Sequence, residues 1–247
     1  MLLYSAIAAA FPDGYCKPLR LCTGLPVNDF KKHRTKLEKI LNRKHHFVAN
    51  GIEYDILLRQ RSTVVMPQPY GLYVSAVIER SEWSDQLVGV LDIGSYTSDW
   101  TIVENLKVRE FANGGAAVGV WTIVNEVKAF LHEQLGATPG TQDLLNSINA
   151  GKYRHFDHDI DLSGVIRIGT MKGTERLVEH LSDSWRDSGN LRIVVGGGGS
   201  SFFAKSLSIT YPHAVVLDSC EPFMNIVEGY YTYLARSNET EKVASSA

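Results

Sequence analysis

The sequence has few cysteines, no long apolar run and almost no net charge. Its three cysteines, Cys16, Cys22 and Cys220, are odd in number and show no C-x-x-C spacing, which favours a reducing compartment over a disulfide framework. No stretch reaches the ~20 apolar residues of a membrane helix, and the N-terminus lacks the basic start of a secretory signal. A formal net charge of -2 gives no basis for direct, non-specific DNA binding. We therefore expect a cytoplasmic protein that contacts neither membrane nor DNA directly.

The remaining composition is that of an ordinary globular protein. A length of 247 residues and 44% hydrophobic content allow one large domain or two moderate ones. Strand and helix patterns intermix, so the fold class is α/β or α+β. Strands are predicted over 88–94, 99–104, 107–112, 191–195 and 214–218. The basic run from Lys31 to Lys44 is interpreted as a solvated helix face.

Other segments have clear local signals. Helical spacing predicts helices over 27–41, 118–135, 173–189 and 222–234. Asn50-Gly51 predicts the turn of a hairpin over 46–58, and a further strand from Ser62 should stop at the prolines that follow. The polar stretch 138–171 is expected to be rich in loops.

The segment VGVLDIGSYTSDWTIV, residues 88–103, has apolar flanks and a polar middle that no core strand would choose. A tight turn there could let Gly94 approach a phosphate closely, with hydrogen bonds donated by Ser95 and Thr97. Asp92 could hold the water shell of Mg²⁺. A plain β-hairpin with Asp and Ser as turn formers explains the local composition equally well.

A second unusual segment, IVVGGGGSSFF, places four glycines directly after an apolar run. Four glycines cost backbone entropy, which indicates close approach to a flat ligand or a phosphate at a helix N-terminus. A flexible turn is the simpler alternative. A dinucleotide-binding reading also fits in part, because Gly196, Gly198 and Ser201 approximate G-x-G-x-x-G and Asp218 follows ~20 residues later. Against it, the third glycine is absent and only ~30 residues follow Asp218.

Taken together, these segments resemble the actin-like ATPase superfamily. LDIGSYTSD is similar to its second phosphate loop, and IVVGGGGSSFF is similar to its adenosine loop. Within the superfamily, LCTGLPVNDF, VMPQPYG and LDSCEPFMNIVEGYYTYL resemble segments of the plasmid-segregation actins, the ParM/StbA family. The resemblance spans residues 15–234 in consistent order.

The resemblance implies an actin-like (ribonuclease H-like) α/β fold with ATP and Mg²⁺ between two lobes. Asp92 would be catalytic and hold the metal, and Gln68 would orient the attacking water. The nucleotide would be bound by Gly94, Ser95, Tyr96, Thr97, Gly196, Gly197, Gly198 and Gly199. Asp99 would serve the structure of the hairpin.

The resemblance also implies a domain organisation. Residues 1–87 would be a remnant of the first lobe, and 88–234 a complete second lobe with a small inserted subdomain at about 138–171. The five strands predicted in the second lobe would pair in one core sheet. Residues 235–247 would be a flexible tail. Family members open with a D-x-G hairpin and a nearby lysine, the first phosphate loop, and this sequence has no match to it. We therefore expect an N-terminally incomplete fold with slow ATP hydrolysis, since phosphoryl transfer needs donors on both sides of the transferred group.

The function implied is that of an ATP-dependent filament former in plasmid or DNA segregation. Its partners would be further copies of itself and an adaptor protein that links it to plasmid DNA. A small-molecule kinase of the same superfamily, a non-hydrolysing nucleotide-binding scaffold and a dinucleotide-binding protein remain alternatives. Metal binding by His155, Asp157, His158, Asp159 and Asp161 is a weaker hypothesis, because surface loops are often rich in Asp and His.

Overall fold

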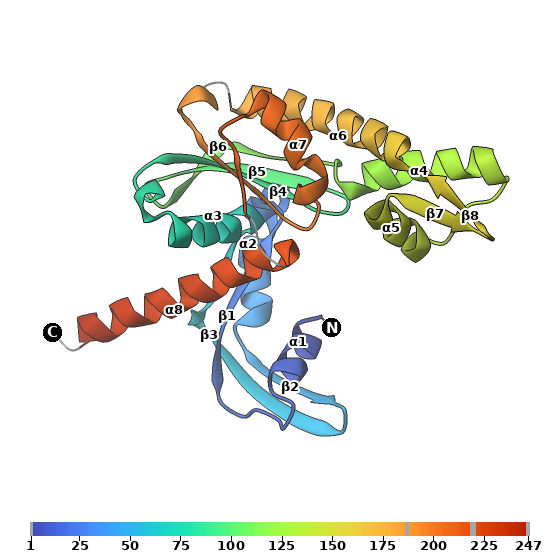
Figure 1. Cartoon of the computed structure of the whole chain (residues 1–247). Helices are drawn as coiled ribbons and strands as arrows, with labels where there is room; N and C mark the ends of the chain where they lie inside the picture. The colour runs from blue at the N-terminus through green and yellow to red at the C-terminus, as the bar shows by residue number, and fades with distance from the viewer. Residues whose placement is uncertain (1, 186–187, 218–220, 246–247) are drawn as a thin grey trace. The chain divides into compact units, whose positions relative to one another are not determined.

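The computed structural model describes residues 2–185, 188–217 and 221–245. Asp218 and Cys220 therefore lie outside the described residues. The chain divides into two compact units. Unit 1 comprises Met1–Gln68 and Tyr230–Ala247, and unit 2 comprises Pro69–Gly229. The two units are described separately, and the elements are labelled in Figure 1.

Unit 1 is built on a three-stranded sheet in the order β1-β3-β2. The strands are β1 (Pro18–Leu25), β2 (Lys44–Ala49) and β3 (Ile52–Pro67). β1 is parallel to β3, and β2 pairs with β3 as an antiparallel hairpin. Asn50 and Gly51 form its turn with φ values of 51° and 77°, as a type I′ turn requires. The predicted hairpin is confirmed.

The strand expected from Ser62 is part of the same long strand, since β3 continues without a break to Pro67. The next residue, Gln68, begins helix α3 (Gln68–Glu79), which the sequence pattern did not predict. Pro69 occupies the first turn of this helix, where a missing N–H costs nothing. The sequence pattern used the prolines only as a signal that ends a strand, whereas Pro69 also helps to begin a helix.

Three helices complete unit 1. They are α1 (Leu2–Ala10), α2 (Val27–Leu41) and the part of α8 (Asn225–Ser245) that follows Gly229. α8 is joined to β1 by the Arg20 guanidinium, whose Nη1 donates to the carbonyl oxygen of Leu234 at 2.8 Å. The buried core of this unit consists of Ile7, Leu41, Tyr54, Ile56, Leu58 and Val65.

Unit 2 contains a five-stranded sheet in the order β10-β9-β4-β5-β6. The strands are β4 (Leu87–Ile93), β5 (Ser98–Glu104), β6 (Lys107–Ala116), β9 (Arg192–Gly196) and β10 (Val215–Val216). β10, β9 and β4 are parallel, whereas β4, β5 and β6 form an antiparallel meander. The predicted set of five strands is confirmed. The meander is incompatible with a doubly wound parallel sheet, so the dinucleotide-binding alternative is wrong.

The helices of unit 2 after α3 are α4 (Val120–Leu135), α5 (Thr141–Ala150), α6 (Ser163–Ser184) and α7 (Ser200–Thr210). Between α5 and α6 lies a two-stranded hairpin, β7 (Lys152–His155) and β8 (His158–Asp161). The stretch expected to be loop-rich is thus largely regular structure. Its polar composition reflects exposure, because α5 buries only Leu144, Ser147 and Ile148. Among the described residues, no helix is long and apolar enough to span a membrane.

The sheet of unit 2 is covered on both faces, as Figure 1 shows. Alternate side chains of β9 point to opposite faces, as expected for a strand. Val194 packs with Leu72 and Tyr73 of α3, whereas Ile193 and Val195 belong to a larger core with the helices α4, α6 and α7. The near-continuous apolar runs of β4 and β9 are thereby explained, since both of their faces are buried.

Candidate functional site

The two unusual turns of the sequence meet at one edge of the sheet of unit 2. β4 and β9 are parallel neighbours, and Asp92 at the end of β4 is in register with Gly196 at the end of β9. The Asp92–Thr97 turn and the glycine turn, Gly196–Gly199, therefore leave the sheet side by side. This is the edge at which open α/β sheets bind ligands.

The glycine turn is fitted closely against Asp92. Gly197 has φ of +88°, and a Cβ atom there would lie 2.2 Å from Oδ1 of Asp92. Gly199 donates its N–H to the carbonyl oxygen of Ile93 at 2.8 Å, and a Cβ atom at Gly199 would lie 2.9 Å from the carbonyl oxygen of Gly94. Gly198 is the exposed member of the turn. Side chains at 197 or 199 would separate the two turns.

The N-terminus of α4 also contacts the Asp92–Thr97 turn. Val120 and Trp121 donate their N–H groups to the carbonyl oxygens of Gly94 and Ser95, at 3.2 Å and 2.7 Å. A Cβ atom at Gly119 would lie 2.5 Å from the carbonyl oxygen of Gly94. Gly119 was not among the predicted site residues, because the helix predicted over 118–135 included it, whereas α4 begins at Val120.

The predicted hydroxyl donors of this turn face solvent. The backbone of the turn is closed by the Gly94 N–H, which donates to the carbonyl oxygen of Thr97 at 2.8 Å. Ser95, Tyr96 and Thr97 are exposed. The ring of Tyr96 packs on that of Trp121 at a centroid distance of 4.8 Å. Ser95 and Thr97 are therefore available to a ligand, whereas Tyr96 is held against α4.

Asp92 and Asp99 form a cross-strand pair between β4 and β5. Asp99 is only 6% exposed. Burial and, as a smaller cause, the nearby Asp99 carboxylate together raise the pKa of Asp92 to about 7. A buried carboxylate with a second carboxylate nearby attracts a divalent cation, and carboxylate oxygens are the ligands that Mg²⁺ prefers.

A pocket of about 410 Å³ lies beside the turn, between α4 and α6. Its lining residues are Tyr96, Thr97, Ala117, Trp121, Thr122, Asn125, Glu126, Lys172 and Arg176. Lys172 Nζ forms an ion pair with Glu126 Oε1 at 2.8 Å, whereas Arg176 forms no ion pair with any described residue. Lys172 and Arg176 were missed by sequence reasoning, because only folding brings α6 next to this turn.

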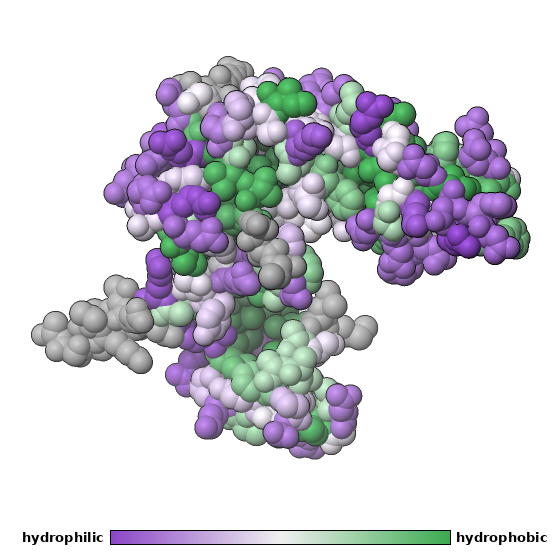
Figure 2. All heavy atoms as spheres, in the orientation of Figure 1, coloured by the Kyte–Doolittle hydropathy of each residue, from purple (hydrophilic) through white to green (hydrophobic). Residues whose placement is uncertain are grey.

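A second pocket, of about 560 Å³, lies between α6 and α7. Met171 and Val178 line it from α6, and Phe202 and Ile209 line it from α7. Figure 2 shows hydrophobic side chains at the surface over α7. Phe202 is three residues beyond Gly199, so this pocket begins close to the glycine turn.

Gln68 belongs to unit 1, whereas the residues described above belong to unit 2. It begins α3, and a Cβ atom at Gly24 of β1 would lie 3.0 Å from its Cγ. Its expected role in orienting water stays a prediction.

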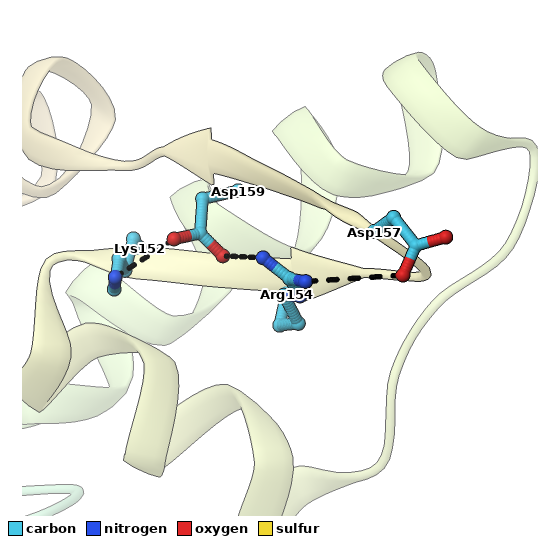
Figure 3. Close-up of polar contacts among 4 residues, drawn as sticks. All are labelled: Lys152, Arg154, Asp157 and Asp159. Carbon is cyan, nitrogen blue, oxygen red and sulfur yellow. Dashed lines mark hydrogen bonds and ion pairs between the residues drawn. The ribbon is translucent and has the colours of Figure 1, made fainter.

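The acidic and histidine-rich segment 155–161 lies in the β7–β8 hairpin, and two of its three carboxylates are paired with cations. Asp159 contacts Lys152 at 2.7 Å and Arg154 at 3.2 Å, and Asp157 lies 3.9 Å from Arg154 (Figure 3). The hydrogen bond from Lys152 is the main cause that lowers the pKa of Asp159. No group of three potential metal ligands occurs among the described residues. The structure therefore gives no support to a metal site here.

Two family models match the chain. The model described as actin-like proteins, N-terminal domain, matches residues 1–71, and the model described as archaeal actin homologue MreB-like, C-terminal, matches residues 90–208. Together they cover 190 of the 247 residues. No curated protein matches the sequence.

Solved structures with the same fold include an archaeal actin homologue, a ParM protein and Alp12. The archaeal homologue Ta0583 in complex with ADP is 15% identical, with a TM-score of 0.78 over 94% of this chain and 77% of that chain. A 15-stranded ParM filament from Clostridium botulinum is 20% identical, with a TM-score of 0.72 over 87% of this chain and 66% of that chain. The Alp12 filament structure is 15% identical, with a TM-score of 0.67 over 96% of this chain and 73% of that chain.

The neighbours are longer than the part that this chain matches, which agrees with the expectation of an actin-like fold that is only partly spanned. The predicted fold class is confirmed, and the order of the matched segments is that of the family. By its two family models and its fold, the chain belongs to the actin-like ATPase superfamily.

Proposed function

We propose that this protein binds Mg²⁺–ATP on unit 2 and assembles into filaments in response to it. The observation that carries the proposal is the contact between Asp92 and Gly197, where a Cβ atom would lie 2.2 Å from the carboxylate oxygen. A positive-φ glycine held against an acid at the end of a buried strand has no use in core packing. It brings a carboxylate and exposed backbone to the same point, as a metal-bound phosphate requires.

The residues of this site suit both the metal ion and the phosphates of such a ligand. Asp92 would hold the water shell of Mg²⁺, with Asp99 adding negative charge behind it. Ser95 and Thr97 would donate hydrogen bonds to phosphate oxygens. When bound, Mg²⁺ would supply the positive charge that neutralises the phosphates.

The two pockets suit the nucleoside. We place the ribose and the inner phosphates near Arg176, whose guanidinium is without an ion-pair partner among the described residues. We place the base in the pocket that Phe202 and Met171 line, because ligand pockets of this size are predominantly apolar with a few polar groups.

Filament assembly is supported by the fold together with the two neighbours described as filaments. We further propose that the filament acts in the segregation of plasmid or other DNA and reaches it through an adaptor protein. Slow hydrolysis, the role of Gln68 and the adaptor remain predictions from the family resemblance.

Calorimetry with Mg²⁺–ATP tests the nucleotide site. We expect binding by the natural chain and a loss of about tenfold or more in Asp92→Asn, because one charge-assisted contact to the metal shell is removed. Asp143→Asn, on the exposed face of α5, is the matched control and should bind normally. Equal binding by all three proteins would contradict the site.

Sedimentation with and without Mg²⁺–ATP tests assembly. Pelleting that needs nucleotide supports the filament. Binding without pelleting would favour the non-hydrolysing scaffold, and ATP consumption that a metabolite stimulates would favour the small-molecule kinase.

A further inference from the structure

The near-zero net charge of the chain hides a strong separation of charge between its two units. Unit 1 carries 13 lysine and arginine residues against 7 aspartate and glutamate residues, a net charge of +6. Unit 2 carries 12 against 20, a net charge of -8. Fields of opposite sign on two parts of one molecule favour head-to-tail association between copies.

The positive charge of unit 1 is concentrated on α2 and its C-terminal end. Lys32, Lys36, Lys39 and Arg43 are all exposed, and their spacing of four, three and four residues places them on one line along the helix. This line, the cationic stripe, lies opposite the buried residues Val27 and Leu41. None of its four members forms an ion pair or hydrogen bond through its side chain with a described residue.

A complementary line of exposed acids runs along α6 in unit 2. Glu175, Glu179 and Asp183 are exposed and spaced four residues apart. These three residues, the acidic stripe, form no ion pair within the described part of the chain. The cations of the same helix, Lys172 and Arg176, line the pocket beside Tyr96.

The two stripes match in spacing as well as in sign. Four residues of helix rise about 6 Å, so successive charges on both stripes are about 5–6 Å apart. We propose that the cationic stripe of α2 in one copy docks on the acidic stripe of α6 in a second copy. This proposal rests on the filament assembly proposed above and names the surfaces that carry it.

Such a contact joins two different surfaces, so a pair of copies retains one free stripe of each sign. A contact of this heterologous kind continues into an open polymer unless its rotation closes a ring. Nucleic acid is a less suitable occupant of the cationic stripe, because the -8 charge of unit 2 opposes approach to a polyanion. A second copy of the chain carries the acidic stripe, which is complementary to the cationic stripe.

Charge reversal on each stripe tests the pairing by sedimentation with Mg²⁺–ATP. We expect Lys36→Glu with Lys39→Glu to raise the concentration needed for pelleting about tenfold or more, because like charges then face each other. Glu179→Lys with Asp183→Lys should act similarly. The four substitutions together should restore pelleting to within about threefold of the natural chain, since the pair is re-formed with reversed sign.

The matched control is Lys17→Glu with Lys107→Glu. It reverses two exposed cations outside α2 and should change pelleting less than about threefold. Calorimetry with Mg²⁺–ATP on each variant should show unchanged nucleotide binding. Raising the salt from about 0.05 M to about 0.5 M should weaken pelleting of the natural chain, because exposed charges are screened.

Several results would overturn the pairing. Equal losses in the control and the α2 variant would mean that only net charge matters, and failure of the combined variant to recover would mean that the stripes face different partners. Retention of the natural chain on a DNA duplex through Lys36 and Lys39, with pelleting unaffected by their reversal, would assign the cationic stripe to nucleic acid. Normal pelleting by both single-stripe variants would overturn the pairing alone, whereas a natural chain that never pellets would overturn the proposed assembly as well.

Discussion

Asp92 and Asp99 lie directly opposite each other on the neighbouring antiparallel strands β4 and β5. Like charges in this arrangement destabilise a sheet, and burial adds to the cost for Asp92. The pair persists beside Gly197, whose own positive φ is strained for any other residue. Unfavourable features that gather at one point indicate a site selected for binding rather than for stability.

The first prediction concerns the pH dependence of stability without metal. The native pKa of Asp92 is about 7, against an ordinary value of 3.8. Between these values the folded state binds more protons than the unfolded state, so the free energy of unfolding should fall as the pH rises from about 4 to about 7. A shift of this size corresponds to about 4 kcal/mol.

Urea unfolding in the presence of a chelator measures this effect. All four tryptophans, Trp83, Trp100, Trp121 and Trp185, lie in unit 2, so their fluorescence reports on that unit. Asp92→Asn should lack most of the decline, because it cannot ionise. Parallel pH profiles for both proteins would show that Asp92 titrates normally.

The second prediction concerns Gly197. Gly197→Ala should cost at least about 2 kcal/mol more than Gly136→Ala, because its new Cβ would meet the Asp92 carboxylate as well as adopt positive φ. Gly136 also has positive φ, of +67°, but nothing lies within 4 Å of a Cβ there. Tryptophan-monitored unfolding gives both values.

A double-mutant cycle separates contact from backbone strain. Asp92→Ala should recover part of the cost of Gly197→Ala, because it removes the atom that the new methyl group meets. Additive effects would mean that strain at 197 and the contact with the backbone of Ile93 account for the whole cost.

The third prediction concerns Arg176. Arg176→Gln should weaken ATP binding about tenfold while leaving the free energy of unfolding within about 0.5 kcal/mol, because this side chain forms no ion pair that folding would lose. Lys128→Gln, also on an exposed part of this region, should bind ATP normally. Calorimetry and urea unfolding test both variants, and a stability loss in Arg176→Gln that accounts for the weaker binding would assign this residue a structural role.

The fourth prediction distinguishes the base from the phosphates. Ser206→Trp introduces a large ring into the pocket between α6 and α7, which Ser206 lines. ATP should bind at least about tenfold more weakly, because the base loses its place. Inorganic tripolyphosphate with Mg²⁺ should bind as before. Unchanged ATP binding would place the base elsewhere.

Much of unit 2 could be predicted from local patterns. The five strands follow from apolar runs that are bounded by turn residues, and the Asn50-Gly51 turn of unit 1 follows from the positive φ that a two-residue hairpin needs. α3 was not predicted because a proline can either end a strand or begin a helix. The local sequence does not distinguish these two cases. The regular structure within 141–161 was missed because exposed elements keep polar residues on most of their surface.

The sequence by itself determined that the Asp92–Thr97 turn and the glycine turn were unusual, since no core strand needs a carboxylate beside a glycine or four glycines in a row. Only the tertiary structure decided that these turns touch, through the parallel pairing of β4 with β9. Only the tertiary structure placed Arg176 and Thr97 in the lining of one pocket. It also showed that a chain with almost no net charge divides into two units of opposite charge. The physical reason is that residue type and spacing act along the chain, whereas contacts between distant segments depend on strand pairing and packing that no local pattern encodes.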